Sequence, residues 1–481
     1  MAVGLLASAC AVKGATVAAA PGGQPTTTTT SRPMKLVGGM TVDPAKGPAG
    51  TAVKVHGHDL PASAPLELVW TTHECRWVLA GDQHEEYHGR KCDAKDVELA
   101  PLTTGADGTV DASFVAPDDF GFAHDVLLLD KAGVVVNKAL FDEAIQVAIA
   151  PDRGPVGTPI TVSVKGMGVD ALENNRQILY DNVYTGWVSA ITTRGSATAV
   201  IPATGRPGTH VVQVARGAFT FPYLNPAQSP RPDIPVFSFT FTVTDGAPVL
   251  PAALADQSPR PTPAKASAVD GPSIAADVAT TPVGSQVTVT GRGLPASADV
   301  KLQWFRIVGN RVAGQGWEEK SIDLPAAKTT SAGTFESSFP APGDVGGPHR
   351  IEATVAGANA VDTTVSITPS VLSISPASGP AGSTFTIALN GVGWTETANI
   401  YTVVYDNAYV GYVCGFNSQG NVTLPMVAAG APGWHFVDLY PAIYKGEETG
   451  GQQSFRIPQL TFTDHPGEKL PVFHFAFQVT G

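Results

Sequence analysis

The sequence has little charge, few cysteines and no long apolar run. Charged residues make up 15% of the 481 residues, and the formal net charge is −12. No cluster of Lys and Arg occurs. This argues against nucleic acid and anionic lipid surfaces as partners, because both are negatively charged and bind clusters of positive side chains. No apolar stretch reaches the roughly eighteen residues that an ordinary membrane-spanning helix needs. We therefore expect neither a nucleic-acid-binding protein nor such a helix.

Signatures of common enzyme classes are missing as well. The chain contains no Gly-x-Ser-x-Gly motif, no phosphate-binding loop and no EF-hand string. Its four cysteines include no pair placed to link the two sheets of an antibody domain. The sequence offers instead 51 Gly and 40 Pro, about a fifth of the chain, which is typical of many turns and few helices. The length predicts roughly three or four domains.

The first residues indicate export. The segment Met1–Cys10 is apolar and ends in Leu-Ala-Ser-Ala-Cys, which resembles the cleavage box of bacterial lipoproteins and predicts a lipid anchor on Cys10. The alternative is an ordinary signal peptide cut near Ala20. Residues 11–38 are rich in Ala, Gly, Pro and Thr and are expected to form a disordered tether.

The second half of the chain repeats the first. Gly154 and Gly379, each followed by Pro, lie 225 positions apart, and His210 and His435 have the same separation. A constant separation over such a length means that one unit was copied with almost no gaps. The repeat predicts the architecture but identifies no ligand or reaction.

Each half is expected to contain two β-sandwich units. Four turns containing Pro-x-Gly each precede a strand of alternating apolar residues. The distance from the turn glycine to the closing glycine alternates between seven and nine residues, which gives an A-B-A-B order. We predict an all-β fold of four tandem immunoglobulin-like β-sandwiches, stiffly paired within each half and loosely connected in the middle. The predicted segments are a signal and tether at 1–38, A1 at 39–147, B1 at 148–245, a Pro/Ala-rich linker at 246–271, A2 at 272–367 and B2 at 368–481.

Matching aromatic and histidine positions support these units. Trp70 and Trp304 lie where an immunoglobulin-like sandwich places its core indole. One histidine also precedes a late strand in every unit, and we predict that its ring bonds upstream backbone at a corner of the sandwich, with metal binding or pH sensing as alternatives. These corner histidines are His124, His210, His349 and His435.

The fourth opening, Ser373–Ser383 followed by Asn390-Gly391, resembles the start of an IPT/TIG-type immunoglobulin-like domain. The other three openings are weaker versions, and the resemblance covers about the first twenty residues of each unit. Such domains occur in bacterial surface adhesins, in receptors and as accessory modules of carbohydrate-active enzymes, and they share no catalytic residues. The resemblance implies a surface protein whose partners are cell-envelope or extracellular proteins or polysaccharides.

The segment between Cys75 and Cys92 carries a peptidase-like string. His84-Glu85-x-x-His88 matches the zinc peptidase motif, in which a helix puts both imidazoles on one face. Glycines flank the string and no third ligand follows, so we predict a decorated loop. The two cysteines favour a disulfide in an exported chain.

A zinc ion held by some of these residues is the alternative, with His73, His84 and His88 as its histidine ligands. No other cofactor is predicted. Cys414 has no evident partner and is expected to be a small buried side chain.

The B units share a further candidate site, a Tyr-Asp-Asn string followed by two more aromatic residues. Rings beside a carboxylate and an amide are typical of sugar sites. The alternative is a strand-turn-strand in which Asp-Asn forms the turn and the rings line the sandwich. The candidate ligand-binding residues are Tyr180, Asp181, Asn182, Tyr184 and Trp187 in B1, and Tyr405, Asp406, Asn407, Tyr409 and Tyr412 in B2.

The sequence thus predicts an exported cell-surface structural or adhesion protein without catalysis. A carbohydrate-binding surface protein that uses the Tyr-Asp-Asn loops is the alternative. A zinc-dependent hydrolase that uses His84, Glu85 and His88 is a more distant one.

Overall fold

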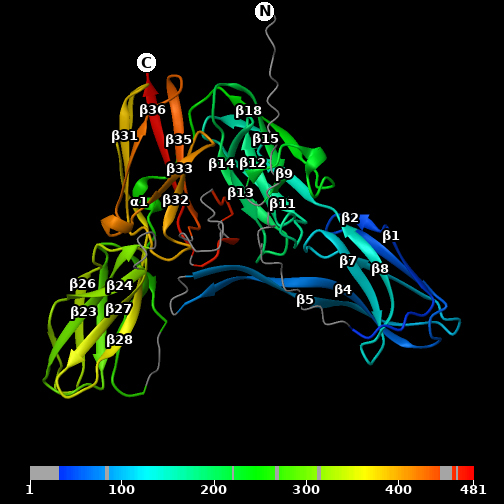
Figure 1. Cartoon of the computed structure of the whole chain (residues 1–481), viewed down its shortest axis with the longest axis horizontal. Helices are drawn as coiled ribbons and strands as arrows, with labels where there is room; N and C mark the ends of the chain where they lie inside the picture. The colour runs from blue at the N-terminus through cyan, green and yellow to red at the C-terminus, as the bar shows by residue number, and fades with distance from the viewer. Residues whose placement is uncertain are drawn as a thin grey trace, which may run out of the picture.

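The computed structural model describes residues 32–81, 86–218, 221–265, 270–310, 316–444, 458–461, 464–467 and 469–481. Within these residues nearly all regular structure is β-strand, and the strands form pairs of packed sheets. The predicted fold class, tandem immunoglobulin-like sandwiches, is therefore confirmed. Figure 1 shows the strands gathered into separate sandwiches, with a long hairpin from A1 running below B1.

The first half contains A1 and B1. Each combines a three-stranded sheet with a five-stranded sheet, in the orders β1-β3-β6 with β2-β8-β7-β4-β5, and β14-β11-β9 with β10-β18-β15-β12-β13. The strands of A1 are β1 (Gly39–Asp43), β2 (Lys46–Gly47), β3 (Ala52–His58), β4 (Pro65–Ala80), β5 (Glu86–Thr103), β6 (Val110–Val115), β7 (Phe122–Leu129) and β8 (Val135–Glu143). Those of B1 are β9 (Gln146–Ala150), β10 (Arg153–Pro155), β11 (Pro159–Lys165), β12 (Asn175–Tyr180), β13 (Val183–Ser189), β14 (Ala197–Pro202), β15 (Gly208–Ala215), β16 (Gly217–Ala218), β17 (Phe221–Pro222) and β18 (Phe237–Thr244), with the 3-10 helix η1 (Pro226–Gln228).

The second half repeats this plan in A2 and B2, and the larger sheet of A2 gains strands from the linker side and from β25. The elements of the linker and A2 are α1 (Leu254–Gln257), β19 (Thr262–Pro263), β20 (Ser273–Ala276), β21 (Val278–Pro282), β22 (Gln286–Arg292), β23 (Asp299–Asn310), β24 (Gly316–Asp323), β25 (Ala327–Lys328), β26 (Phe335–Pro340), β27 (Gly347–Val355) and β28 (Val361–Thr368). Those of B2 are β29 (Ser370–Ser375), β30 (Ser378–Pro380), β31 (Thr384–Asn390), β32 (Ile400–Tyr405), β33 (Ala408–Cys414), η2 (Phe416–Ser418), β34 (Val422–Val427), β35 (Gly433–Ala442) and β36 (Phe473–Thr480).

Alternating side chains build a separate core in each sandwich. In β3 every second residue is buried, as Val53 and Val55 illustrate, because successive side chains of a strand point to opposite faces. Trp70 and Trp304 are fully buried at the centres of the A1 and A2 cores. Their positions confirm the predicted core indoles.

The two A–B junctions are built alike. Gly121 N donates to Met167 O at 3.1 Å in the first half, and Gly346 N donates to Val392 O at 3.0 Å in the second. A side chain on either glycine would meet the backbone of the neighbouring unit, since a Cβ on Gly121 would lie 1.9 Å from Gly166 O. Glycine at this corner is therefore required for the A unit to contact the B unit so closely.

The expectation of a loose middle is wrong, because B1 and B2 pack directly against each other. Val404, Tyr440 and Leu460 of B2 belong to the buried cluster of B1. The edge strand β13 also exchanges backbone hydrogen bonds with B2: Trp187 N donates to Pro458 O at 2.9 Å and Leu460 N donates to Trp187 O at 2.8 Å. The outer faces of the two larger sheets thus form a second, shared core.

The linker is likewise held against the units around it. Gln257 at the end of α1 exchanges two hydrogen bonds with the backbone of His474, at 2.7 and 2.8 Å. Val249 N donates to Val156 O at 2.8 Å, and β19 pairs with β21 of A2. The described part of the Pro/Ala-rich segment therefore follows the surfaces of B1, B2 and A2.

Candidate functional site

The corner histidines have the structural role that the sequence predicts. In every unit the ring Nε2 lies 2.5–2.8 Å from the carbonyl oxygen of the residue four positions earlier, which fixes the turn that leads into the strand carrying the histidine. The partners of Nδ1 differ between unit types: a backbone carbonyl in the A units and an aspartate in the B units. Its hydrogen bond to Asp406 raises the pKa of His435 above the usual value for histidine.

In the A units each corner histidine stacks on the core tryptophan. The ring centroids of Trp70 and His124 are 4.2 Å apart, and those of Trp304 and His349 are 4.8 Å apart. A buried aspartate completes each group, because Trp70 Nε1 donates to Asp119 at 3.0 Å and Trp304 Nε1 donates to Asp344 at 3.1 Å. Sequence reasoning missed both aspartates, although they share the 225-position separation of the repeat.

The Tyr-Asp-Asn strings form tight turns between β12 and β13 and between β32 and β33. Asp181 and Asn182 have φ values of 49° and 66°, and Asp406 and Asn407 have 46° and 64°. Positive φ at both central positions is typical of type I′ hairpin turns, where Asp and Asn are favoured. The carboxylate of each aspartate then forms hydrogen bonds with the ring of the corner histidine and with the backbone N–H of the next residue. For Asp181 these partners are His210 at 2.6 Å and Val211 N at 2.8 Å.

The aromatic residues of these strings pack within the protein. Tyr180 and Tyr405 donate their hydroxyls to Thr204 O at 2.9 Å and Ala429 O at 2.7 Å. Tyr184 and Tyr409 meet edge to face across the B1–B2 contact, with centroids 6.5 Å apart, and Trp187 is buried in the same contact.

Among the six aromatic rings of the candidate site only Tyr412 is exposed. Asn407 donates to Pro202 O of B1 at 2.8 Å, which leaves its side chain in the contact between the units. The turn interpretation accounts for these contacts, and a sugar site here stays a prediction.

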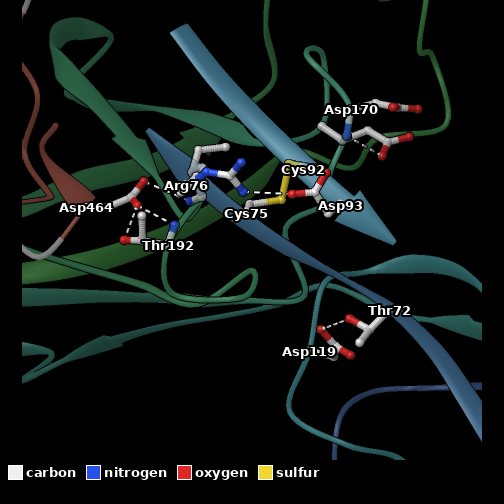
Figure 2. The surroundings of a disulfide bond; sticks show 11 residues. Thr72, Cys75, Arg76, Cys92, Asp93, Asp119, Asp170, Thr192 and Asp464 are labelled. Atoms are coloured by element: carbon white, nitrogen blue, oxygen red, sulfur yellow. Dashed lines mark hydrogen bonds and ion pairs between the residues drawn. A yellow bond between two sulfur atoms is a disulfide. The ribbon is translucent and has the colours of Figure 1, made fainter. Parts of the chain in front are cut away.

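The predicted disulfide between Cys75 and Cys92 is confirmed, and it joins directly opposed residues of β4 and β5 (Figure 2). His73 lies on β4 and His88 on β5, where His88 Nε2 bonds Glu86 at 3.1 Å. His84 and Glu85 lie outside the described residues, as does Cys10. Among the residues that the structure describes, no group of three or more His, Cys, Asp or Glu is placed to hold a metal ion.

Two expectations about this part of the chain are wrong. The extra residues of A1 do not form a decorated loop, because β4 and β5 continue as a hairpin of 16 and 18 residues. Cys414 is exposed instead of buried, at the end of the outward-facing row of β33. Extended strands of this length reach roughly 50 Å, enough to leave the sandwich to which they belong.

The hairpin ends on B2, far along the chain from A1. Trp77 Nε1 donates to Asp464 O at 2.7 Å, and Tyr87 N donates to Glu396 Oε2 at 2.6 Å. The rings of Trp77 and Tyr87 lie 6.0 Å apart. Figure 1 shows the hairpin reaching from A1 toward the red loops of B2. The hairpin therefore connects A1, the first unit, to B2, the fourth, through side-chain hydrogen bonds.

Asp464 organises the meeting point of B1 and B2. Its carboxylate accepts hydrogen bonds from Ser189 Oγ, Ile191 N, Thr192 N and Thr192 Oγ1, at 2.5–2.8 Å. Burial raises the pKa of Asp464, and these hydrogen bonds offset part of that effect. Figure 2 shows Asp464 and Thr192 beside the disulfide-linked hairpin. Sequence reasoning missed this residue as well.

A cavity of about 560 Å³ opens where all four units meet. The hairpin of A1 contributes Trp77 and Leu79, B1 contributes Thr192, and A2 contributes Gly347 and Pro348. B2 supplies the rest of the wall, Thr395, Thr397, Ala398, His465 and Gly467. Cavities at domain interfaces with an apolar lining and a few polar groups are typical ligand sites, so this is the candidate functional site.

A buried glutamate makes the A1–B1 junction sensitive to pH. Glu143 is 2% exposed, and burial together with the charge of Asp119 raises its pKa to about 8. An unfolded glutamate titrates near about 4.3. Between these values the folded protein holds a proton that the unfolded chain has released, so stability falls as pH rises.

We expect Glu143→Gln to flatten the pH dependence of unfolding between about pH 5 and 8 and to stabilise the protein by roughly 4–5 kcal/mol at pH 8. Gln keeps the shape of the protonated acid without its ionisation. Urea unfolding at a series of pH values measures the effect, with Glu98→Gln on β5 as the control. Equal slopes for the wild type and Glu143→Gln would contradict the assignment.

No protein-family model matches this chain, and no curated protein matches it. Among solved structures it is similar to a crystal structure of Salmonella alpha-2-macroglobulin, with 12% identity, 93% of this chain and 31% of that chain covered, and a TM-score of 0.19. Escherichia coli alpha-2-macroglobulin activated by porcine elastase is 12% identical, with 93% of this chain and 44% of that chain covered and a TM-score of 0.18. A D1–D4 ectodomain fragment of ICAM-5 is 13% identical, with 88% of this chain and 98% of that chain covered and a TM-score of 0.17.

The chain spans about a third of the Salmonella protein. At these TM-scores the similarity indicates no function. In the described part of the chain, no helix combines the length and apolar character needed to cross a membrane.

Proposed function

We propose that this chain is an exported, non-catalytic surface protein that acts as a structural or adhesion module. Its four sandwiches present one fixed body to the outside, with a lipid on Cys10 as the anchor to the cell. The partners are cell-envelope or extracellular proteins or polysaccharides. The IPT/TIG-like openings of the four units support an adhesive role.

The observation that carries the proposal is the disulfide-clamped hairpin. Cys75 and Cys92 are bonded on the segment that straps A1 to B2. Disulfides persist in oxidising compartments and are rare in the cytosol. A disulfide on the hairpin that connects A1 to B2 therefore fits a protein that works outside the cytosol.

A non-catalytic role is supported by how the titratable groups are used. The corner histidines bond backbone carbonyls, and the turn aspartates of the B units bond these histidines and backbone amides. Asp119 and Asp344 accept hydrogen bonds from the indole N–H groups of the core tryptophans. A catalytic group needs access to a substrate, whereas these groups are engaged in holding the fold.

The proposal is tested by labelling intact producing cells with a membrane-impermeant amine reagent and by trapping thiols with an alkylating agent during lysis. Labelling of the protein on intact cells, and resistance of Cys75 and Cys92 to alkylation before reduction, are expected. A cytosolic protein of the same cells serves as the control for lysis. Labelling seen only after lysis, together with alkylated Cys75 and Cys92, would overturn the proposal.

Adhesion is tested separately with purified protein on the insoluble cell-envelope fraction of the producing organism. Depletion from solution that saturates with protein concentration is expected. A variant, Tyr412→Ala, removes the exposed ring of the predicted sugar site. Full depletion by that variant would assign the binding to another surface, and no depletion of the wild type would contradict an adhesive role.

A further inference from the structure

The cavity between the four units has walls that no single unit could supply. Trp77 and Leu79 reach it on the hairpin of A1, and Pro348 enters from β27 of A2. His465 belongs to B2 and Thr192 to B1. Its volume of about 560 Å³ lies within the range of small-molecule sites, about 300–1,000 Å³.

None of the described residues that line the cavity carries a charged side chain. Asp464 lies next to it, but its carboxylate is saturated by donors of B1 and its carbonyl accepts from Trp77. Burial lowers the pKa of His465 to about 4, so its ring is neutral at neutral pH. An ionic ligand would find no free opposite charge among the described residues of the wall, so its desolvation free energy would not be offset by an ion pair.

A few polar groups are available for a ligand. Thr395 and Thr397 are 7% and 4% exposed, and both line the cavity, so their hydroxyls are the polar groups nearest to a ligand. Beside the wall, Trp394 Nε1 is buried without a partner in the described part of the chain, and it lies against Gly347. Buried polar groups in proteins are almost always hydrogen-bonded, so the unpartnered N–H of Trp394 favours a molecule that can accept a hydrogen bond near it.

We propose that this cavity binds a neutral, largely apolar small molecule that carries a hydroxyl, carbonyl or weakly basic aryl amine group. Trp77, Leu79 and Pro348 contact its apolar part, and the hydroxyls of Thr395 and Thr397 bond its polar group. Because the wall comes from all four units, the bound molecule stabilises their mutual arrangement. The proposal stands on the cavity alone and does not depend on where the protein is located.

The test uses N-phenyl-1-naphthylamine, a neutral apolar fluorophore with one N–H group, titrated into the full-length protein. Saturable binding at one site per chain, with increased and blue-shifted emission, is expected. 1-Anilinonaphthalene-8-sulfonate has the same skeleton with an added sulfonate and is expected to bind at least about tenfold more weakly. Equal binding of the anionic probe, or no saturable binding of the neutral one, would overturn the proposal.

Variants place the bound probe in the cavity. Leu79→Trp fills the cavity from the hairpin side and is expected to weaken binding at least about tenfold. Leu140→Trp adds the same ring at a position on β8 that is 54% exposed, and it is expected to bind like the wild type.

Pro348→Phe fills the cavity from A2 and replaces Leu79→Trp if circular dichroism shows that the latter does not fold. Unchanged binding by a folded cavity-filling variant would show that the probe binds elsewhere and would contradict the assignment.

Discussion

Replacing Asp464 with alanine is expected to lower the free energy of unfolding by about 3–5 kcal/mol. The substitution leaves the buried N–H group of Ile191 and the partly buried N–H group of Thr192, which donate at 2.8 and 2.6 Å, without an acceptor. An orphaned buried donor costs about 1–3 kcal/mol. Urea unfolding of the full chain, followed by tryptophan fluorescence, measures the loss.

Two control variants separate the carboxylate from its surroundings. Thr192→Val removes only the hydroxyl that donates to Asp464 at 2.7 Å, and it is expected to cost about 1 kcal/mol. Asp464→Asn keeps one acceptor oxygen and is expected to fall between alanine and the wild type. An Asp464→Ala protein that unfolds at the wild-type urea concentration would show that the B1–B2 junction does not depend on this residue.

Trp304→Ala is expected to destabilise A2 by about 3–5 kcal/mol. The indole is fully buried and stacks on His349 with 4.8 Å between centroids, so its removal leaves a cavity in the core. Asp344 also loses the Nε1–H donor at 3.1 Å while it stays buried. Thermal unfolding followed by circular dichroism detects the change.

Trp304→Phe refines this expectation. It keeps an aromatic ring against His349 but removes the N–H group, so about half of the loss is expected to remain. Phe221→Ala removes a ring that is 55% exposed and is expected to stay within about 0.5 kcal/mol of the wild type. A loss for Trp304→Ala no larger than that of Phe221→Ala would contradict its place at the centre of the core.

Features set by local pattern could be predicted from the sequence. Alternating strands such as β3, the repeat, the corner histidines and the opposed pair Cys75 and Cys92 all depend on residues close in sequence or on the constant repeat length. In each case spacing alone limits which side chains can meet.

The association of the units could not be predicted in this way. Asp464 and the donor Thr192 are 272 positions apart, and no local pattern connects them. One signal was present in β12, where Ile178-Leu179-Tyr180 shows no alternation because both faces of the strand are buried. The prediction of a loop between Cys75 and Cys92 is wrong because the extra residues of A1 extend two paired strands, whereas extra residues in a sandwich are usually expected in a loop.

The most direct test of the central claim, that four sandwiches form one fixed body, is a pulsed electron double resonance measurement. Spin labels are attached through Glu74→Cys on β4 of A1 and Val427→Cys on β34 of B2. Cys414→Ser removes the free thiol of the described residues, and Cys10→Ser removes the remaining cysteine outside the disulfide. A single narrow distance distribution is predicted, because the hairpin and the B1–B2 core fix these units together. A broad distribution, as expected for beads on a flexible chain, would contradict the account.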